Sequence, residues 1–170
     1  MRKTMDDIGA GDGAALATRV GLYTPEQRAR RDASVWTLVQ GILAPLQFLA
    51  FAVSLVLVLR YLASGDGYFA ATLSILIKTA LLLTIMVTGA IWEKVVFGQY
   101  LLAPAFFWED VVSFVVIALH LAYVAALMTG ALGATGQMWL ALAAYATYAV
   151  NAAQFILKLR RARLQSRGMA

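Results

Sequence analysis

Four long apolar stretches decide what this chain can fold into. They run from about residue 34 to 62, 68 to 96, 105 to 129 and 137 to 158. A helix rises about 1.5 Å per residue, so each stretch can cross roughly 30 Å of bilayer hydrocarbon with length left for tilt. Lipid cannot satisfy an open backbone, and the alternation typical of barrel strands is absent. The sequence therefore predicts an all-α integral membrane protein, a bundle of four transmembrane helices.

The composition excludes several function classes. Hydrophobic residues make up 62% of the 170-residue chain and charged residues only 14%, whereas a soluble domain carries about a quarter charged residues. This excludes a disordered protein and most soluble enzymes. The net charge of +5 comes from the chain ends and not from a basic groove, so no nucleic-acid partner is expected. With no cysteine and one histidine, a thiolate or paired-histidine metal site is also excluded.

The polar ends of the chain flank the predicted transmembrane domain, residues 34–160. Residues 1–21, which are rich in glycine and aspartate, predict a flexible N-terminal tail. Residues 22–33 predict a short interfacial helix, because Thr24-Pro25-Glu26-Gln27 has the pattern of a capping box with proline in the first helical position. Residues 161–170 predict a basic C-terminal tail.

The distribution of lysine and arginine predicts the orientation in the membrane. Basic residues gather before the first apolar stretch and after the last one, whereas the connections after the first and third stretches have only Arg60 at an edge. By the positive-inside rule, both termini are predicted to be cytoplasmic, and an even number of spans agrees with this. The connection at residues 97–104 is then cytoplasmic as well.

Each predicted transmembrane helix carries polar residues on one face. These are Gln40, Gln47 and Ser54 on the first helix, Lys78, Glu93 and Lys94 on the second, Glu109, Asp110, Ser113 and His120 on the third, and Thr147, Asn151 and Gln154 on the fourth. Because the helices alternate in direction, one group lies near the cytoplasmic face: Gln40, Glu93, Glu109, Asp110, Asn151 and Gln154. A deeper group consists of Gln47, Lys78 and His120. The pattern predicts a polar site in the inner leaflet with a polar shaft above it.

A purely structural interpretation exists for most of these residues. Interhelical hydrogen bonds, worth about 0.6 kcal/mol each, are the ordinary explanation for the amides and hydroxyls. A single histidine such as His120 is more often a hydrogen-bonded core residue than a ligand. Lys78 is harder to explain, since a charge in mid-membrane costs about 2.5–3.5 kcal/mol and needs a partner or a function. The adjacent acids Glu109 and Asp110 also call for a function.

Two classes of function suit such a site. One is an acid–base enzyme that acts on a large, flat, apolar substrate from the inner leaflet. The other is a non-catalytic pigment or lipid binder, or a small proton-coupled carrier. The chain has no phosphate-binding loop, metal-ligand spacing or nucleophile elbow, and residue spacing alone does not decide between the two classes.

Three blocks carry a family resemblance. They are residues 33–45 (ASVWTLVQGILAP), residues 89–110 (GAIWEKVVFGQYLLAPAFFWED) and residues 145–155 (YATYAVNAAQF). Together they resemble the 2-vinyl or 3-vinyl bacteriochlorophyllide hydratases of bacteriochlorophyll biosynthesis, over about Leu22 to Leu164. The second block is long and unusual, so the resemblance is specific.

The resemblance implies a cofactor-free hydro-lyase in the inner (cytoplasmic or intracytoplasmic) membrane of a phototrophic bacterium. It would add water to the C3-vinyl group of chlorophyllide a or a bacteriochlorophyllide and give the 1-hydroxyethyl derivative. Water is the only co-substrate, and magnesium belongs to the substrate. The resemblance further implies hand-over of the product to a separate dehydrogenase. A homo-oligomer could help to enclose the macrocycle. The alternative is a non-catalytic membrane protein that binds or carries tetrapyrroles.

Vinyl hydration begins with proton transfer to carbon, so the hypothesis requires a carboxylic acid that keeps its proton near neutral pH. Glu109 or Glu93 is the expected acid, and Asp110 or the remaining glutamate the expected base. The expected substrate-binding residues are Gln40, Trp92, Lys94, Trp108, His120, Asn151 and Gln154. His120 would be an axial ligand to the substrate magnesium, but it lies eleven residues, about 16 Å, from Glu109. Either water ligates the metal instead, or His120 works with Lys78.

Overall fold

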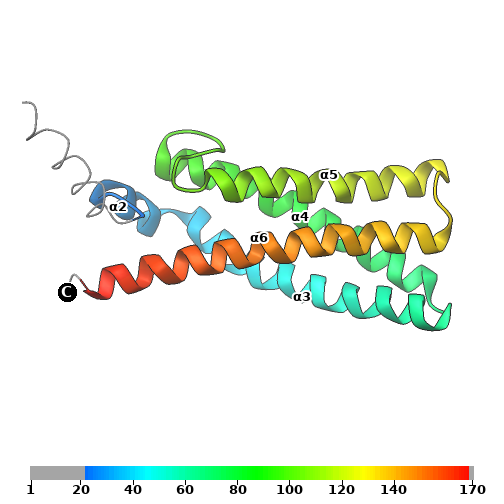
Figure 1. Ribbon diagram of the computed structural model, residues 1–170. Helices are drawn as coiled ribbons and strands as arrows, with labels where there is room; N and C mark the ends of the chain where they lie inside the picture. The colour runs from blue at the N-terminus through cyan, green and yellow to red at the C-terminus, as the bar shows by residue number, and fades with distance from the viewer. Residues whose placement is uncertain (1–21, 169–170) are drawn as a thin grey trace, which may run out of the picture.

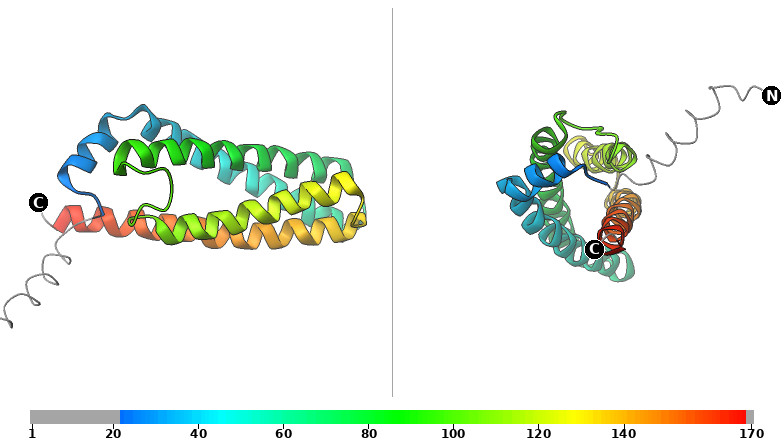
Figure 2. Two further views of the ribbon diagram at one scale, coloured as in Figure 1. Left: turned by 90° about the horizontal axis from the view of Figure 1, so that it is seen from above. Right: turned by 90° about the vertical axis from the view of Figure 1, so that its left-hand side faces the viewer.

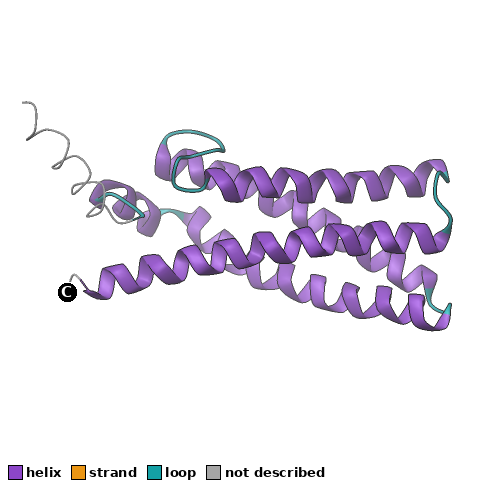
Figure 3. Cartoon of the chain, in the orientation of Figure 1, coloured by secondary structure: helices purple, strands orange, loops and turns teal. Residues whose placement is uncertain are grey.

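Five helices make up most of the part of the chain that the structure, a computed structural model, describes: residues 22–168, with side chains through residue 164. They are α2 (Pro25–Ala33), α3 (Val35–Ser64), α4 (Tyr68–Phe97), α5 (Phe107–Thr129) and α6 (Ala134–Gly168) (Figure 1). Within this range the chain contains no strand (Figure 3). The tail predicted for residues 1–21 lies outside the described residues.

The predicted four membrane-length helices are confirmed. Val35–Ser64, Tyr68–Phe97, Phe107–Thr129 and Ala134–Leu164 are each long and apolar enough to cross a bilayer. The main difference from the sequence prediction lies in α6, which continues past Lys158 to Gly168, so the basic stretch that was expected to form a tail is helical there. Helix α5 begins at Phe107 rather than 105, because a tight turn in which the Phe106 N–H donates to Ala103 O (2.7 Å) precedes it.

The short N-terminal helix is also confirmed, together with its capping box. The Gln27 N–H donates to Thr24 Oγ1 (3.2 Å), and the Thr24 N–H donates to Gln27 Oε1 (2.9 Å). Ser34 then interrupts the helix with an extended backbone and caps α3 by accepting the Trp36 N–H (3.2 Å). This break lets α2 leave the axis of α3 and lie at an angle to the bundle (Figure 2).

The long helices pack as two pairs, α3 with α4 and α5 with α6, and fewer contacts join the pairs. The connections at residues 65–67 and 130–133 lie at one end of the bundle, called here the turn end. Helix α2, the connection at residues 98–106 and the last turns of α6 lie at the other, called here the α2 end (Figures 1 and 2). A hydrophobic core fills the bundle toward the turn end with Val58, Ile75, Tyr123, Met138 and Tyr145. Space for a ligand is therefore left toward the α2 end.

Candidate functional site

A cavity of about 970 Å³, called here the central cavity, lies between the helix pairs. All four long helices and α2 line it. On α4 its lining runs from Glu93 to Leu82, which is eleven residues or about 16 Å of helix. Gln47 of α3 and Tyr148 of α6 belong to the end farther from α2. A large, mostly apolar cavity with a few polar groups is typical of a small-molecule site.

Two buried carboxyl groups meet in this cavity. Glu93 lies in the last part of α4 and Asp110 in the first turn of α5. Both residues line the cavity and are only 5% and 4% exposed, and two neighbouring N–H groups of one connection bring their carboxyl groups close together. Two buried carboxylates held close together repel each other, which favours a state in which one of the two groups keeps a proton. The pair can therefore provide an acid and a base side by side.

Consecutive backbone amides hold the two carboxyl groups. The Leu102 N–H donates to Asp110 Oδ2 (2.7 Å), and the Ala103 N–H donates to Glu93 Oε2 (3.2 Å). The connection achieves this with unusual backbone: φ is +116° at Leu101 and +57° at Leu102, neither of which is a glycine. Such conformations cost on the order of 1–3 kcal/mol each and cluster at functional sites. The strained backbone allows two consecutive N–H groups to donate to two different carboxyl groups.

Aromatic rings support this connection. Phe106 contacts Trp92, Phe97 and Phe155, with ring centroids 5.7–5.8 Å apart. The aromatic rings of this region divide into two groups: these pack together, whereas Trp108 is 68% exposed. Of these packed rings, Trp92, Phe106 and Phe155 line the central cavity together with the carboxyl pair.

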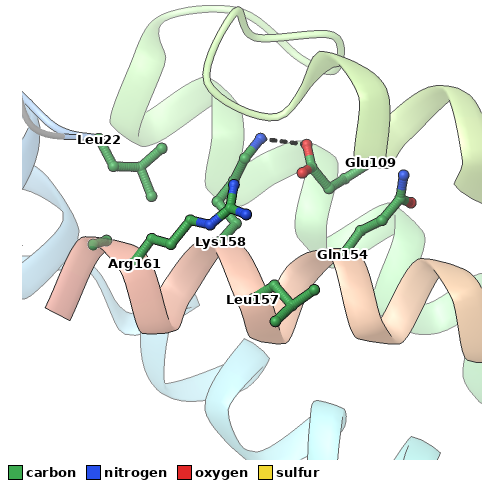
Figure 4. Close-up of a pocket in the computed structure, with 7 residues that line it drawn as sticks. Leu22, Glu109, Gln154, Leu157, Lys158 and Arg161 are labelled. Carbon is green, nitrogen blue, oxygen red and sulfur yellow. Dashed lines mark hydrogen bonds and ion pairs between the residues drawn. The ribbon is translucent and has the colours of Figure 1, made fainter. Parts of the chain in front are cut away.

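Glu109 does not line the central cavity, although it neighbours Asp110 in sequence. Its carboxylate forms an ion pair with Lys158 of α6, which also donates to Ala105 O. With Gln154 and Arg161 these groups line a separate pocket of about 410 Å³, called here the Lys158 pocket (Figure 4). Adjacent residues of a helix point about 100° apart, so the two acids serve different sites.

His120 and Lys78 form a polar pair outside the lining of the central cavity. The ring Nδ1–H of His120 donates to Val116 O (2.7 Å), and Nε2 therefore accepts from Lys78 Nζ (2.9 Å). The ammonium group also lies 4.2 Å from the Tyr148 ring centroid, within the range of a cation–π contact. Both nitrogens of the only imidazole are thus engaged within the bundle, and Lys78 has the partner that its depth demands.

Three other predicted residues do line the central cavity. Gln40 donates to Thr88 Oγ1 (2.7 Å), and Trp92 donates through its indole N–H to Thr37 Oγ1 (2.9 Å). Asn151 donates to Ser113 Oγ (2.7 Å), while its Oδ1 has no hydrogen-bond partner in the described part of the chain.

The remaining predicted residues lie elsewhere. Gln154 belongs to the Lys158 pocket. Lys94 is exposed and donates to Gly98 O (2.8 Å), and Trp108 is exposed too. Neither of these two lines the central cavity.

Sequence reasoning missed one part of the site and described two others only in general terms. The amides of Leu102 and Ala103 carry no side-chain signal, and a Leu-Leu pair gives no hint of positive φ. Arg28, Arg31 and Arg163 line the mouth of the cavity, whereas the sequence grouped them with the basic chain ends. The sequence places Gln47 in the deeper polar group, with an interhelical hydrogen bond as its ordinary role, but its amide has no hydrogen-bond partner among the described residues.

The structure defines a class of protein. It is a bundle of membrane-length helices around an apolar cavity with a pair of buried carboxyl groups, and such a site can carry out acid–base chemistry on a large apolar ligand. Comparison with known proteins gives the family. Residues 23–161 match the family model described as 2-vinyl bacteriochlorophyllide hydratase. The chain belongs to this family, as its sequence blocks predicted, and it is therefore an enzyme of the hydro-lyase class.

Two relatives carry the same description. A 2-vinyl bacteriochlorophyllide hydratase of Rhodobacter capsulatus is 73% identical over 149 residues, which cover 88% of this chain and 86% of the relative. One of Cereibacter sphaeroides is 76% identical over 143 residues, which cover 84% and 89%. No solved structure matches the chain.

Proposed function

We propose that the chain adds water to the C3-vinyl group of chlorophyllide a or a bacteriochlorophyllide, with the macrocycle in the central cavity and the vinyl group at Glu93 and Asp110. The observation that carries this proposal is the convergence of the two buried carboxyl groups at one part of an apolar cavity. The reaction takes water as its only co-substrate, and the magnesium is part of the substrate.

The first chemical step is proton transfer from a carboxylic acid to the terminal vinyl carbon. The C=C π bond supplies the electrons for the new C–H bond, and the cation left on the inner carbon is delocalised over the macrocycle. Glu93 is the proposed acid, because the carbonyl end of α4 disfavours a negative charge there. Asp110 lies at the amide end of α5 and accepts the shorter amide contact, which favours its carboxylate form.

In the second step a water molecule attacks the cation and forms the new C–O bond. Asp110 takes the proton that this water releases, and proton exchange within the carboxyl pair restores the acid on Glu93. Vinyl group and water are consumed in equal amounts, with no net change in the enzyme. The unpartnered Oδ1 of Asn151 is an acceptor that can orient the water, because the Asn151 amide is already fixed through Ser113.

The mouth of the cavity suits the propionate group of a chlorophyllide that is entering the site. Arg28 and Arg31 of α2 and Arg163 of α6 line it, and arginine recognises carboxylates well. Arg31 is oriented by Asp32 (2.7 Å) and lies over the Tyr23 ring (4.7 Å). Burial raises the pKa of the Tyr23 phenol, so this ring stays neutral beside a bound carboxylate.

The substrate magnesium is proposed to carry a water ligand. His120 was the candidate axial ligand, but both of its ring nitrogens are occupied by Val116 and Lys78. Glu109 is proposed to have a structural and not a catalytic role, since its ion pair with Lys158 holds α6 against the start of α5.

The proposed location is the inner membrane of a phototrophic bacterium, with both termini cytoplasmic. Arg28, Arg30 and Arg31 of α2 lie at the same end of the bundle as the basic last turns of α6. Helix α2 would then lie at the membrane surface and the central cavity in the inner leaflet, where an apolar pigment gathers. A homo-oligomer and hand-over of the product to a dehydrogenase are part of the same proposal.

A direct assay tests the proposal. Detergent-solubilised protein is mixed with chlorophyllide a in heavy-oxygen water without any cofactor, and the pigment is analysed by chromatography and mass spectrometry. The expected product is the hydroxyethyl derivative with the heavy oxygen. Saturable binding of unchanged pigment would instead favour the carrier alternative. Asp66→Asn is the matched control, because this exposed acid lies at the turn end and should leave the rate unchanged.

A further inference from the structure

Gln47 is a buried amide without a protein partner. It is 3% exposed, lines the central cavity, and neither Nε2 nor Oε1 makes a hydrogen bond to a described residue. Gln40, two turns earlier on α3, provides the contrast: it also lines the cavity, but its Nε2 donates to Thr88. One amide is thus satisfied by the fold and the other is not.

An unsatisfied amide is costly in such a place. Buried polar groups are almost always paired, because a group buried without a partner loses the hydrogen bonds that it makes with water in the unfolded chain. Lipid tails and apolar side chains cannot form a hydrogen bond with the Gln47 amide. The missing partner is therefore expected to come from whatever occupies the central cavity.

Gln47 and the carboxyl pair lie at opposite ends of this cavity. Gln40 lies beside Gly89, since a Cβ on Gly89 would be 3.7 Å from Gln40 Oε1. Gln47 is seven residues farther along α3, about 10 Å, and Glu93 is four residues the other way along α4, about 6 Å. The two groups are thus separated by roughly 16 Å along the bundle axis.

A (bacterio)chlorophyllide has complementary groups across a similar span. The pyrrole ring opposite the vinyl-bearing one is fused to a fifth ring, which carries a ketone. With the vinyl group at Glu93, this ketone points toward Gln47. A ketone oxygen accepts hydrogen bonds, and the Gln47 Nε2 is a donor.

We propose that Gln47 donates a hydrogen bond to the ring ketone of the substrate and so determines which edge of the macrocycle meets the acid. This inference rests on the proposed function and assigns Gln47 as a positioning residue. A macrocycle bound the other way round would bring no vinyl group to Glu93 and would leave the Gln47 amide unpaired.

Gln47→Met tests the proposal, because methionine has nearly the same length and no polar group. Resonance Raman spectra of bound chlorophyllide should show the ketone stretch at lower frequency in the unsubstituted protein, and at the frequency of a free ketone in the variant. The matched control is Gln40→Met, which loses its bond to Thr88 and should keep the lowered stretch. An unchanged ketone stretch in Gln47→Met would overturn the proposal.

Two further measurements separate the possible failures. Affinity for chlorophyllide should fall about tenfold in Gln47→Met, and much less for an analogue in which a methylene group replaces the ketone; equal losses for both pigments would contradict the ketone assignment. Thermal unfolding without pigment should show Gln47→Met to be at least as stable as the unsubstituted protein, whereas a large loss would mean that the amide has a structural partner. If the unsubstituted protein binds no pigment, the proposed function itself fails.

Discussion

Replacement of Glu93 by glutamine is the most direct test of the proposed chemistry. Glutamine has the size of glutamate, and its Oε1 can still accept the Ala103 N–H that Glu93 accepts at 3.2 Å. Its amide can also donate to Asp110, so the geometry of the pair is retained. What is lost is the proton that can be transferred to carbon.

The expected magnitude follows from the role of a general acid. Such a group typically contributes about 10²–10⁴-fold, which corresponds to roughly 2.7–5.4 kcal/mol of transition-state stabilisation. Because Glu93 is only 5% exposed, bulk water is a poor substitute donor. We therefore expect the turnover number of Glu93→Gln to fall at least a hundredfold while chlorophyllide affinity changes less than threefold.

The assay measures pigment binding and hydration separately. Binding is followed by the absorption change of chlorophyllide on titration, and hydration by single-turnover formation of the hydroxyethyl product. Proton transfer to carbon also predicts a slower reaction in deuterium oxide for the unsubstituted protein. If Glu93→Gln retains more than a tenth of the rate, Glu93 is not the acid; if it loses pigment binding equally, its role is in binding.

Three further substitutions test neighbouring features. Glu109→Gln should remove the ion pair with Lys158 and lower thermal stability, with a rate loss of only a few-fold; abolished turnover with unchanged pigment binding would restore Glu109 as a catalytic acid. His120→Ala should leave the absorption of bound pigment unchanged but cost about 1–3 kcal/mol of stability, because Lys78 loses its acceptor; a shifted pigment band would show that the ring ligates magnesium. Gly98→Ala should lower the free energy of unfolding by about 1 kcal/mol for backbone reasons alone, since φ is +88° and the space around Gly98 is open. The measurement is unfolding in detergent, and an unchanged stability would show that alanine adopts this turn without strain.

Much of the fold could be predicted from the sequence, because its determinants are local. The four apolar stretches specify membrane-length helices through the cost of unsatisfied backbone in lipid. The start of α2 follows from a capping box that involves only Thr24 and Gln27. The family follows from the sequence blocks alone, the most specific of which is residues 89–110.

The arrangement of the site was decided by tertiary structure. Glu93 and Asp110 were both predicted as candidates, but that these two meet depends on the path of the connection between α4 and α5 and on its positive φ at Leu101 and Leu102. Sequence could not separate Asp110 from its neighbour Glu109, because the rotation of α5 about its own axis sends one into the central cavity and the other to Lys158.

The same reason explains Gln40 and Gln47, which share one face of α3 in the sequence but differ in the structure. Thr88 of α4 accepts a hydrogen bond from the first, whereas the amide of the second has no hydrogen-bond partner among the described residues. Transfer into lipid is a property of each residue and can be summed along a sequence. Hydrogen-bond partners across a bundle depend on how helices with apolar surfaces rotate against one another, and only the packed structure determines that.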